Sequence, residues 1–138
     1  MSFARGKGFG RGSGGLGRKP RTDRDYSRRQ EQDAASRYGM QTTVASGATD
    51  HAREKMDLRP IPSGTGLAID EFQGECKTTK HASFSLNEGV LRKAVQQAAV
   101  VGKRPFIEVE LRGLGVGVPK KWVTLTADDF AELTRRAS

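Results

Sequence analysis

Glycine and positive charge are concentrated at the N-terminal end of this chain, and this limits the part that can build a core. Seven of the 17 glycines lie in the first 17 residues, and residues 1–29 carry nine basic and two acidic side chains. Glycine-rich stretches of like charge bury too little apolar surface to offset the entropy of ordering. We therefore expect a disordered, basic Arg/Gly-rich arm over residues 1–24 of the 138-residue chain, and one folded domain over residues 25–138.

The charge of the arm indicates contact with a polyanion. The chain has a net charge of +8, of which +7 lies in residues 1–29, so the remainder is nearly neutral. Basic side chains neutralise phosphates, and the rings of Phe3 and Phe9 could stack on bases. A passive tail or a transit peptide are alternatives, although glycine opposes the amphipathic helix of a transit peptide. The arm residues that we expect to contact nucleic acid are Arg5, Lys7, Arg11, Arg18 and Lys19.

The composition excludes several classes of protein. The longest apolar run, residues 98–101, is far shorter than the roughly 20 residues of a membrane helix. A single cysteine rules out an internal disulfide framework, and two histidines 30 residues apart do not match a zinc motif. No apolar stretch typical of a secretory signal follows the first basic residue. We expect an intracellular protein without membrane contact or organic cofactor, located in the cytoplasm or nucleoid, or in the host cytoplasm if phage-encoded.

Hydrophobic periodicity predicts an α/β fold. Apolar residues recur at helical spacing over residues 87–101, whereas residues 106–111 alternate as in a strand. The expected helices are 24–38, 87–101 and 127–136, and the expected strands are 40–44, one beginning at 55–58, 67–79 with a turn near 70–71, 106–111 and 122–125. This order predicts a compact α/β domain with a mixed sheet.

The sequence Glu75-Cys76-Lys77 lies within one predicted strand. Because side chains alternate along a strand, Glu75 and Lys77 share one face while Phe72, Gly74 and Cys76 share the other. A carboxylate can bind a divalent cation, and a neighbouring ammonium can offset charge that develops on a phosphate. Cys76 is expected to be a small buried hydrophobe and not a nucleophile.

Two further carboxylates are candidates for the same site. Glu31 points toward the packed side of the first helix, where an unpaired carboxylate is costly, and Asp57 stands at the start of a strand. Together with Glu75 they would offer the oxygen ligands that Mg²⁺ and Mn²⁺ prefer. Asp50 and Asp70 are rivals of Asp57 for the aspartate role. Asp33 is a lesser rival of Glu31, because it projects from another side of the helix.

These residues follow an order that resembles a known family. The order is Glu31, Ala35, Gly39, Ser46-Gly47-Ala48, Asp57 and Glu75-Cys76-Lys77-Thr78-Thr79. It resembles the PD-(D/E)XK nuclease superfamily, particularly the archaeal-type Holliday junction resolvases and their phage relatives, over about residues 25–112. The resemblance implies a restriction-endonuclease-like core, with a central mixed sheet flanked by helices.

The resemblance also implies roles for individual residues. Asp57 and Glu75 would bind Mg²⁺, for which Mn²⁺ could substitute, with the main-chain carbonyl of Cys76 as a further ligand. Lys77 would contact the scissile phosphate or the attacking water, and Glu31 would complete the acidic site. Ser46 and Gly47 would lie near the DNA backbone. Lys80, just after the site strand, is a further candidate DNA contact.

The activity implied is that of a metal-dependent endonuclease that cuts four-way DNA junctions. Symmetrical resolution needs two opposed cuts, so a homodimer with twofold symmetry is expected. Two alternatives stay open: a non-catalytic nucleic-acid-binding protein, and a related nuclease that nicks linear or flapped DNA.

Several other residues carry weaker expectations. Trp122 is expected in the core or a dimer interface. The pairs 103–104 and 120–121 are expected to be solvated strand ends, and His51 is expected to be solvated. His81 is a possible DNA contact beside Lys80.

Overall fold

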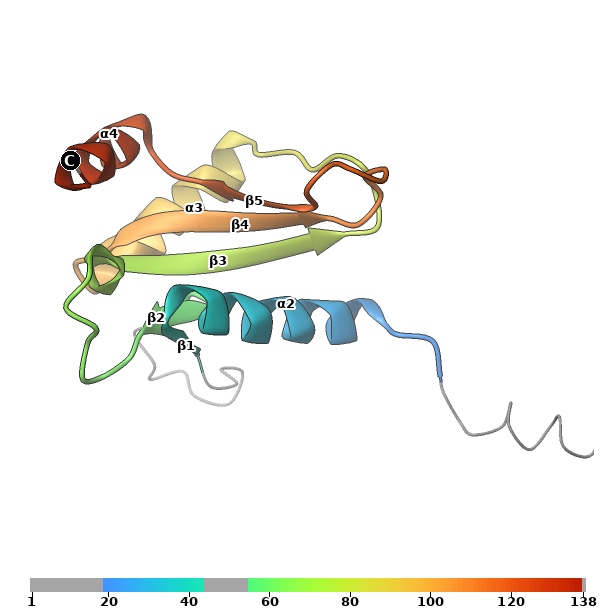
Figure 1. The fold of residues 1–138 in the computed structure, drawn as a ribbon, viewed down its shortest axis with the longest axis horizontal. Coiled ribbons are helices and arrows are strands. Elements are labelled where there is room, and N and C mark those ends of the chain that lie inside the picture. Colours follow the sequence, from blue (N-terminus) through green and yellow to red (C-terminus); the bar gives the residue numbers. More distant parts are fainter. Residues whose placement is uncertain (1–18, 44–54, 138) are drawn as a thin grey trace, which may run out of the picture.

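The computed structural model describes residues 19–43 and 55–137, which form one five-stranded sheet with helices on both faces. In chain order the elements are α2 (Asp23–Tyr38), β1 (Met40–Thr42), β2 (Leu58–Pro60), the 3₁₀ turn η2 (Ala68–Glu71), β3 (Phe72–Thr79), α3 (Glu88–Val100), β4 (Arg104–Leu111), β5 (Lys121–Thr124) and α4 (Ala127–Arg136) (Figure 1). The α/β class and the mixed sheet predicted from the sequence are confirmed.

The spatial order of the strands is β1-β2-β3-β4-β5, so every strand lies beside its neighbour in the sequence. Strands β3 and β4 are parallel over their full length, from Phe72 opposite Arg104 to Thr79 opposite Leu111, and α3 makes the crossover between them. The other strand pairs are antiparallel. The pairing of the short strand β2 with β3 is centred on Leu58 opposite Gly74, which places the segment before β2 beside the middle of β3.

Capping residues set the ends of the helices. Thr22 accepts a hydrogen bond from the Asp25 amide, so α2 begins at Asp23, one residue earlier than expected. Gly39 ends α2 with φ at +69°, a conformation that glycine adopts without strain. Asn87 caps α3 and Thr126 caps α4, as the sequence predicts.

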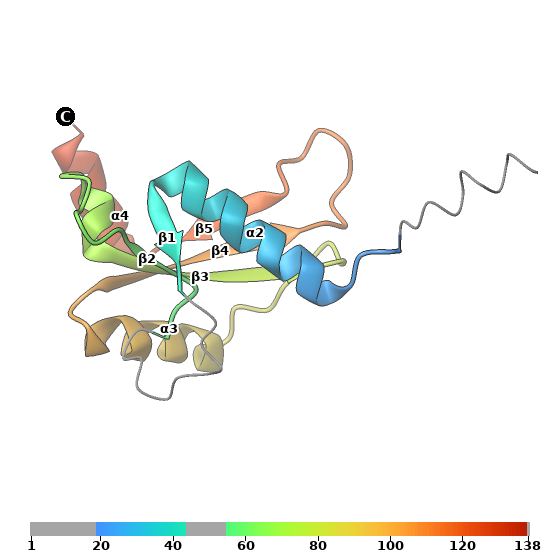
Figure 2. The ribbon, with the colours of Figure 1, turned by 90° about the horizontal axis from the view of Figure 1, so that it is seen from below.

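Helices α2 and α3 cover opposite faces of the sheet (Figure 2), and each face carries its own hydrophobic core. One core, on the face covered by α2, consists of Ala34, Met40, Leu58, Phe72 and Phe106. The other, on the face covered by α3, consists of Met56, Ala94, Ala98, Ile107 and Val109. Gly74 is needed on the α2 face, because a Cβ there would lie 2.2 Å from the Phe106 ring. The central strands β3 and β4 are therefore buried on both sides.

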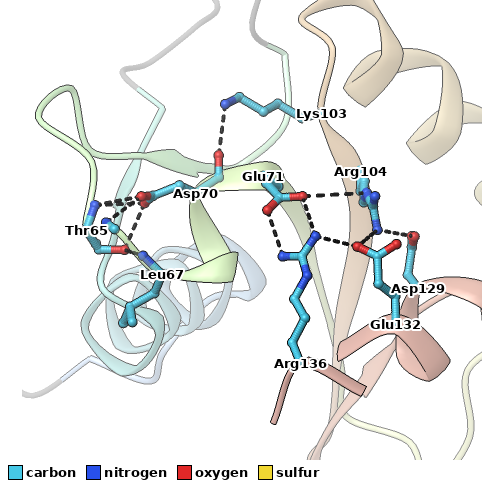
Figure 3. A network of polar contacts seen from close by, with 10 residues as sticks. Thr65, Leu67, Asp70, Glu71, Lys103, Arg104, Asp129, Glu132 and Arg136 are labelled. Atoms are coloured by element: carbon cyan, nitrogen blue, oxygen red, sulfur yellow. Dashed lines mark hydrogen bonds and ion pairs between the residues drawn. The ribbon is translucent and has the colours of Figure 1, made fainter. Parts of the chain in front are cut away.

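Ion pairs join the last helix to the sheet. Arg104, at the start of β4, pairs with Asp129 at 3.0 Å and with Glu132 at 3.1 Å, and Arg136 pairs with Glu71 at 2.7 Å (Figure 3). Lys103 donates to the Asp70 carbonyl at 2.8 Å. The expectation that residues 103–104 form a solvated strand end is therefore wrong: this pair connects η2, β4 and α4.

Other expectations also need correction. Trp122 lies on the edge strand β5 with 52% of its surface exposed, and its indole N–H donates to the Pro119 carbonyl, so it is not a core residue. The second strand begins at Leu58, which leaves Asp57 in the preceding loop. Lys120 is exposed, as expected for a solvated strand end, and donates to the Leu114 carbonyl, whereas Lys121 is half-buried and pairs with Asp33.

None of the helices in the described part of the chain is long and apolar enough to cross a membrane.

Candidate active site

The site is built around Glu75 and Lys77 on the central strand β3. The two side chains emerge on the same face, as alternation predicts, and their Oε2 and Nζ atoms lie 3.6 Å apart. The Glu75 side chain is only 12% exposed and that of Lys77 is 31% exposed. This is a partly desolvated ion pair on the sheet face that α3 covers.

Asp57 reaches the site from the loop that enters β2. Because Leu58 lies opposite Gly74 in an antiparallel pair, the preceding residue Asp57 falls opposite Glu75. The amide of the next residue, Cys76, donates to Asp57 Oδ2 at 2.8 Å. Burial raises the pKa of Glu75, and the negative charge of Asp57 raises it further. The antiparallel register thus joins two carboxylates that are 18 positions apart in the sequence.

Glu31 approaches the same point from α2. Burial is the largest cause of the rise in its pKa to about 7, and the negative charges of Asp57 and Glu75 add to it. The pKa of Glu75 is likewise raised to about 7, first by burial and then by Asp57, while Lys77 and, more weakly, Lys93 lower it. Three carboxylates from three elements therefore repel one another in a partly buried place.

The rival carboxylates lie elsewhere. Asp70 accepts hydrogen bonds from the amides of Thr65 and Gly66 and from the Thr65 hydroxyl, at 2.7–2.9 Å (Figure 3). The Thr65 amide is the main cause of its lowered pKa. Asp33 points away from the site and pairs with Lys121 at 3.5 Å. Asp50 lies outside the described residues. Among the candidates the structure describes, Asp57 and Glu31 are therefore the two that meet Glu75.

The donor set suits a hard cation. Carboxylate oxygens are the ligands that Mg²⁺ and Mn²⁺ favour. The pKa values of Glu31 and Glu75 are raised by burial and by neighbouring negative charge, and a bound cation would offset that charge. Among residues 19–43 and 55–137, no three Asp, Glu, His or Cys side chains are yet close enough to hold a metal ion. Binding would therefore require side-chain rotation of Glu31, Asp57 or Glu75.

Cys76 takes no part through its side chain. The thiol packs against the core on the α2 face, opposite to Glu75 and Lys77, as alternation predicts. Burial is the main cause of a rise in the pKa of the thiol, and the surrounding carboxylates add to it. A thiol that stays protonated is a poor nucleophile.

The sequence did not indicate a role for two residues near the site. Lys93 on α3 lies close enough to Glu75 to lower its pKa, and only the crossover geometry brings it there. Glu108 on β4, opposite Cys76, is completely buried. Its carboxylate accepts hydrogen bonds from Gln30 Nε2 at 3.2 Å and from the Tyr38 hydroxyl, and pairs with Arg37 at 3.5 Å. The available signal for Glu108 was the position of its strand after a predicted crossover helix, because a strand that such a helix makes parallel to its neighbour is usually buried on both faces.

The candidate DNA contacts are divided between described and undescribed parts. Lys19 is exposed just before α2, and Lys80 is exposed in the turn that follows β3, beside His81. The remaining candidates lie outside the described residues: Arg5, Lys7, Arg11, Arg18, Ser46 and Gly47. His51, which was expected to be solvated, lies outside them as well.

A comparison with protein-family models found no match to this chain, and comparisons with curated proteins and with solved structures found none either.

Proposed function

We propose that the protein is a metal-dependent, structure-specific DNA endonuclease, with four-way junctions as its preferred substrate. One arrangement carries the proposal: Lys77 pairs with Glu75 at 3.6 Å, and the amide of the adjacent Cys76 binds the Asp57 carboxylate at 2.8 Å. Glu31, on α2, is near enough to Asp57 and Glu75 for their charges to add to the rise in its pKa that burial causes. This is the acidic and basic set by which the sequence resembles the PD-(D/E)XK nucleases. A restriction-endonuclease-like core is part of the same proposal.

The residues divide the chemistry between them. Asp57 and Glu75 would hold Mg²⁺ or Mn²⁺, with the Cys76 carbonyl as a further ligand and Glu31 binding directly or through a water. A bound cation of this kind supplies an activated water and offsets negative charge on the phosphate. Lys77 would orient the water or stabilise the charge that develops as the phosphodiester bond breaks. The ion pair of Lys77 with Glu75 keeps the ammonium at the required place.

The substrate is proposed on electrostatic and symmetry grounds. The strongly basic segment 1–29 leads into α2 and includes the first residues of that helix. Because α2 also carries Glu31, a polyanion bound to this segment would lie near the site. Resolution of a four-way junction requires two symmetrical cuts, and a homodimer with twofold symmetry would provide two sites.

The test is cleavage of a labelled four-way junction beside a linear duplex made from the same arms. It compares Mg²⁺ with chelator, and the wild-type protein with Glu75→Gln. Glu88→Gln is the matched control, because Glu88 is an exposed residue at the start of α3 that pairs only with Arg92 among the described residues. We expect paired cuts near the branch that require Mg²⁺ and Glu75 but not Glu88.

Other outcomes have definite meanings. Equal cutting of the linear or a flapped duplex would replace the junction by the broader substrate. Tight binding without any cut in Mg²⁺ or Mn²⁺ would contradict the nuclease and leave a DNA-binding protein.

A further inference from the structure

A second polar groove lies on the other flank of α2, away from Glu31. Residues 29 and 31 are separated by about 200° around a helix, so Arg29 and Glu31 point to different sides of the buried residues Gln30 and Ala34. A pocket of about 270 Å³ opens on the Arg29 side, between α2 and the ends of β4 and β5. Its lining is Arg21, Tyr26, Arg29, Gln30, Asp33, Glu110, Arg112 and Lys121.

The charge of this groove is positive. Four basic side chains face two carboxylates in the pocket, and a neighbouring pocket that shares Glu110 and Lys121 adds Arg37 and Lys120. Lys121 is paired with Asp33 and Arg37 with Glu108. Within the part of the chain that the structure describes, Arg21 and Arg29 form no ion pair, and both are exposed. Their charges are therefore available to an anion.

The groove is also held in shape. The Arg112 guanidinium lies 3.7 Å from the centre of the Tyr26 ring, and its Nε donates to the Thr78 hydroxyl at 3.1 Å. Arg112 thereby connects α2 to the end of β3. The Arg21 guanidinium also lies over this ring, 5.9 Å from its centre, so two cations already contact the ring that a base would stack on. Charge without a free aromatic face favours a duplex backbone over a single strand.

We propose that this groove, between α2 and the ends of β4 and β5, binds the phosphodiester backbone of a DNA duplex at a place separate from the acidic site. The inference rests on the proposed function in one respect, since a junction offers a second arm while the first is at the acidic site. Arg21 and Arg29 would make the phosphate contacts, and Arg112 and Lys121 would add to the positive field.

The experiment measures the affinity of the full chain for a labelled four-way junction, in chelator so that no cleavage occurs, over a range of salt concentrations. The main variant is Arg21→Gln with Arg29→Gln. Arg135→Gln is a control on α4, far from this groove in the fold and likewise without an ion pair in the described residues. A variant with both arginines changed to lysine restores the charge.

For the double glutamine variant we expect the slope of log affinity against log salt to become shallower by about two, and affinity to fall roughly 10- to 60-fold at about 0.1 M salt. The lysine variant should recover most of this loss, while Arg135→Gln should change the slope by much less. Thermal unfolding should change little in all variants, because these side chains are exposed and form no ion pair in the described residues, and the contact of Arg21 with the Tyr26 ring is long, at 5.9 Å.

An affinity and salt slope in the double variant equal to those of Arg135→Gln would overturn the groove. This failure is distinct from failure of the proposed function. If cleavage depends on Glu75 but the groove variants bind normally, only the groove is wrong. If no variant or condition gives cleavage but the groove variants lose affinity, the groove stands and the nuclease is wrong. Preferential loss of single-stranded DNA binding would overturn the assignment to a duplex.

Discussion

Two glutamates on neighbouring strands, Glu108 and Glu75, have opposite kinds of neighbours. Glu108 on β4 is completely buried, yet Gln30, Arg37 and Tyr38 all direct donors to its carboxylate. Glu75 on β3 is less buried, but two of its nearest charged neighbours, Asp57 and Glu31, are themselves acidic. The sheet separates the two carboxylates, because they project from opposite faces.

The difference shows which of the two carboxylates is structural. The donors around Glu108 replace the water that it loses on burial, so it is satisfied within the chain and joins α2 to the sheet. The carboxylates around Glu75 instead add repulsion, which Lys77 and, more weakly, Lys93 partly relieve. A site that keeps such repulsion is a candidate for binding something from outside, and a divalent cation has the matching charge.

The largest expected effect separates the two glutamates by activity. Glu75→Gln should reduce the rate of junction cleavage by about 10³-fold or more, since it removes a metal-binding charge while keeping the size of the side chain. Glu108→Gln should reduce the rate far less, because its carboxylate faces the other side of the sheet. Single-turnover cleavage rates at saturating Mg²⁺ test this. Equal losses in the two variants would contradict the distinction.

The free energy of unfolding should show the opposite ranking, with a larger loss from substitution of Glu108 than from substitution of Glu75. Glu108→Ala should lower the free energy of unfolding by about 2 kcal/mol, because the Tyr38 hydroxyl and Arg37 lose their acceptor, while Gln30 Nε2 keeps only the main-chain carbonyl of residue 108 at 3.1 Å. Glu108→Gln retains an acceptor and should lose less. Glu75→Gln should not destabilise the metal-free protein, since it removes repulsion. Denaturant unfolding in chelator measures all three, and a stable Glu108→Ala protein would show that the network contributes little.

A smaller effect is expected from pH. The folded protein holds the pKa values of Glu31 and Glu75 at about 7, above the ordinary value of 4.5. These two carboxyl groups therefore bind protons more tightly in the folded state than in the unfolded state. The stability that their protonation contributes is fully present below about pH 4.5 and is lost as the pH rises through about 7. In chelator, Tm should fall over this interval, and the fall should be smaller in Glu75→Gln. Mg²⁺ should restore Tm at the upper end. A wild-type Tm whose pH dependence equals that of Glu75→Gln would contradict the repulsion.

The smallest effect on activity is expected at Asp70. Because its carboxylate accepts from the amides of Thr65 and Gly66, Asp70→Asn should lower Tm slightly while cleavage stays within about twofold of wild type. Asp57→Asn is the contrasting variant and should lose cleavage as Glu75→Gln does. Parallel rate measurements on the two variants decide between these aspartates, and a large loss in Asp70→Asn would reopen its role.

Much of the site could be predicted because it follows from local pattern and from one short-range pairing. Strand alternation was enough to place Glu75 and Lys77 together and Cys76 on the opposite face. The local sequence pattern could not decide whether Asp57 or Asp70 lies beside Glu75. It depends on the turn around Gly64 and Gly66, both at positive φ, which directs the Thr65 and Gly66 amides toward Asp70.

The contacts that were missed all depend on distant segments. Glu108 lies 78 positions from Gln30, and alternation alone could not show that both faces of its strand are covered. Arg104 seemed to be a solvated strand end because its partners on α4 are 25 positions or more away in the sequence. Trp122 was expected in the core or a dimer interface, and the edge position of β5 leaves it exposed, which rules out only the core.

The central claim is that Glu75 belongs to a cation site and Glu108 does not. Titration of the metal-free protein with Mn²⁺, with free Mn²⁺ followed by its electron paramagnetic resonance signal, tests it most directly. We predict saturable binding that Glu75→Gln removes and that Glu108→Gln and Glu88→Gln retain. Mn²⁺ binding of unchanged strength in Glu75→Gln, or no binding to the wild-type protein, would contradict the account.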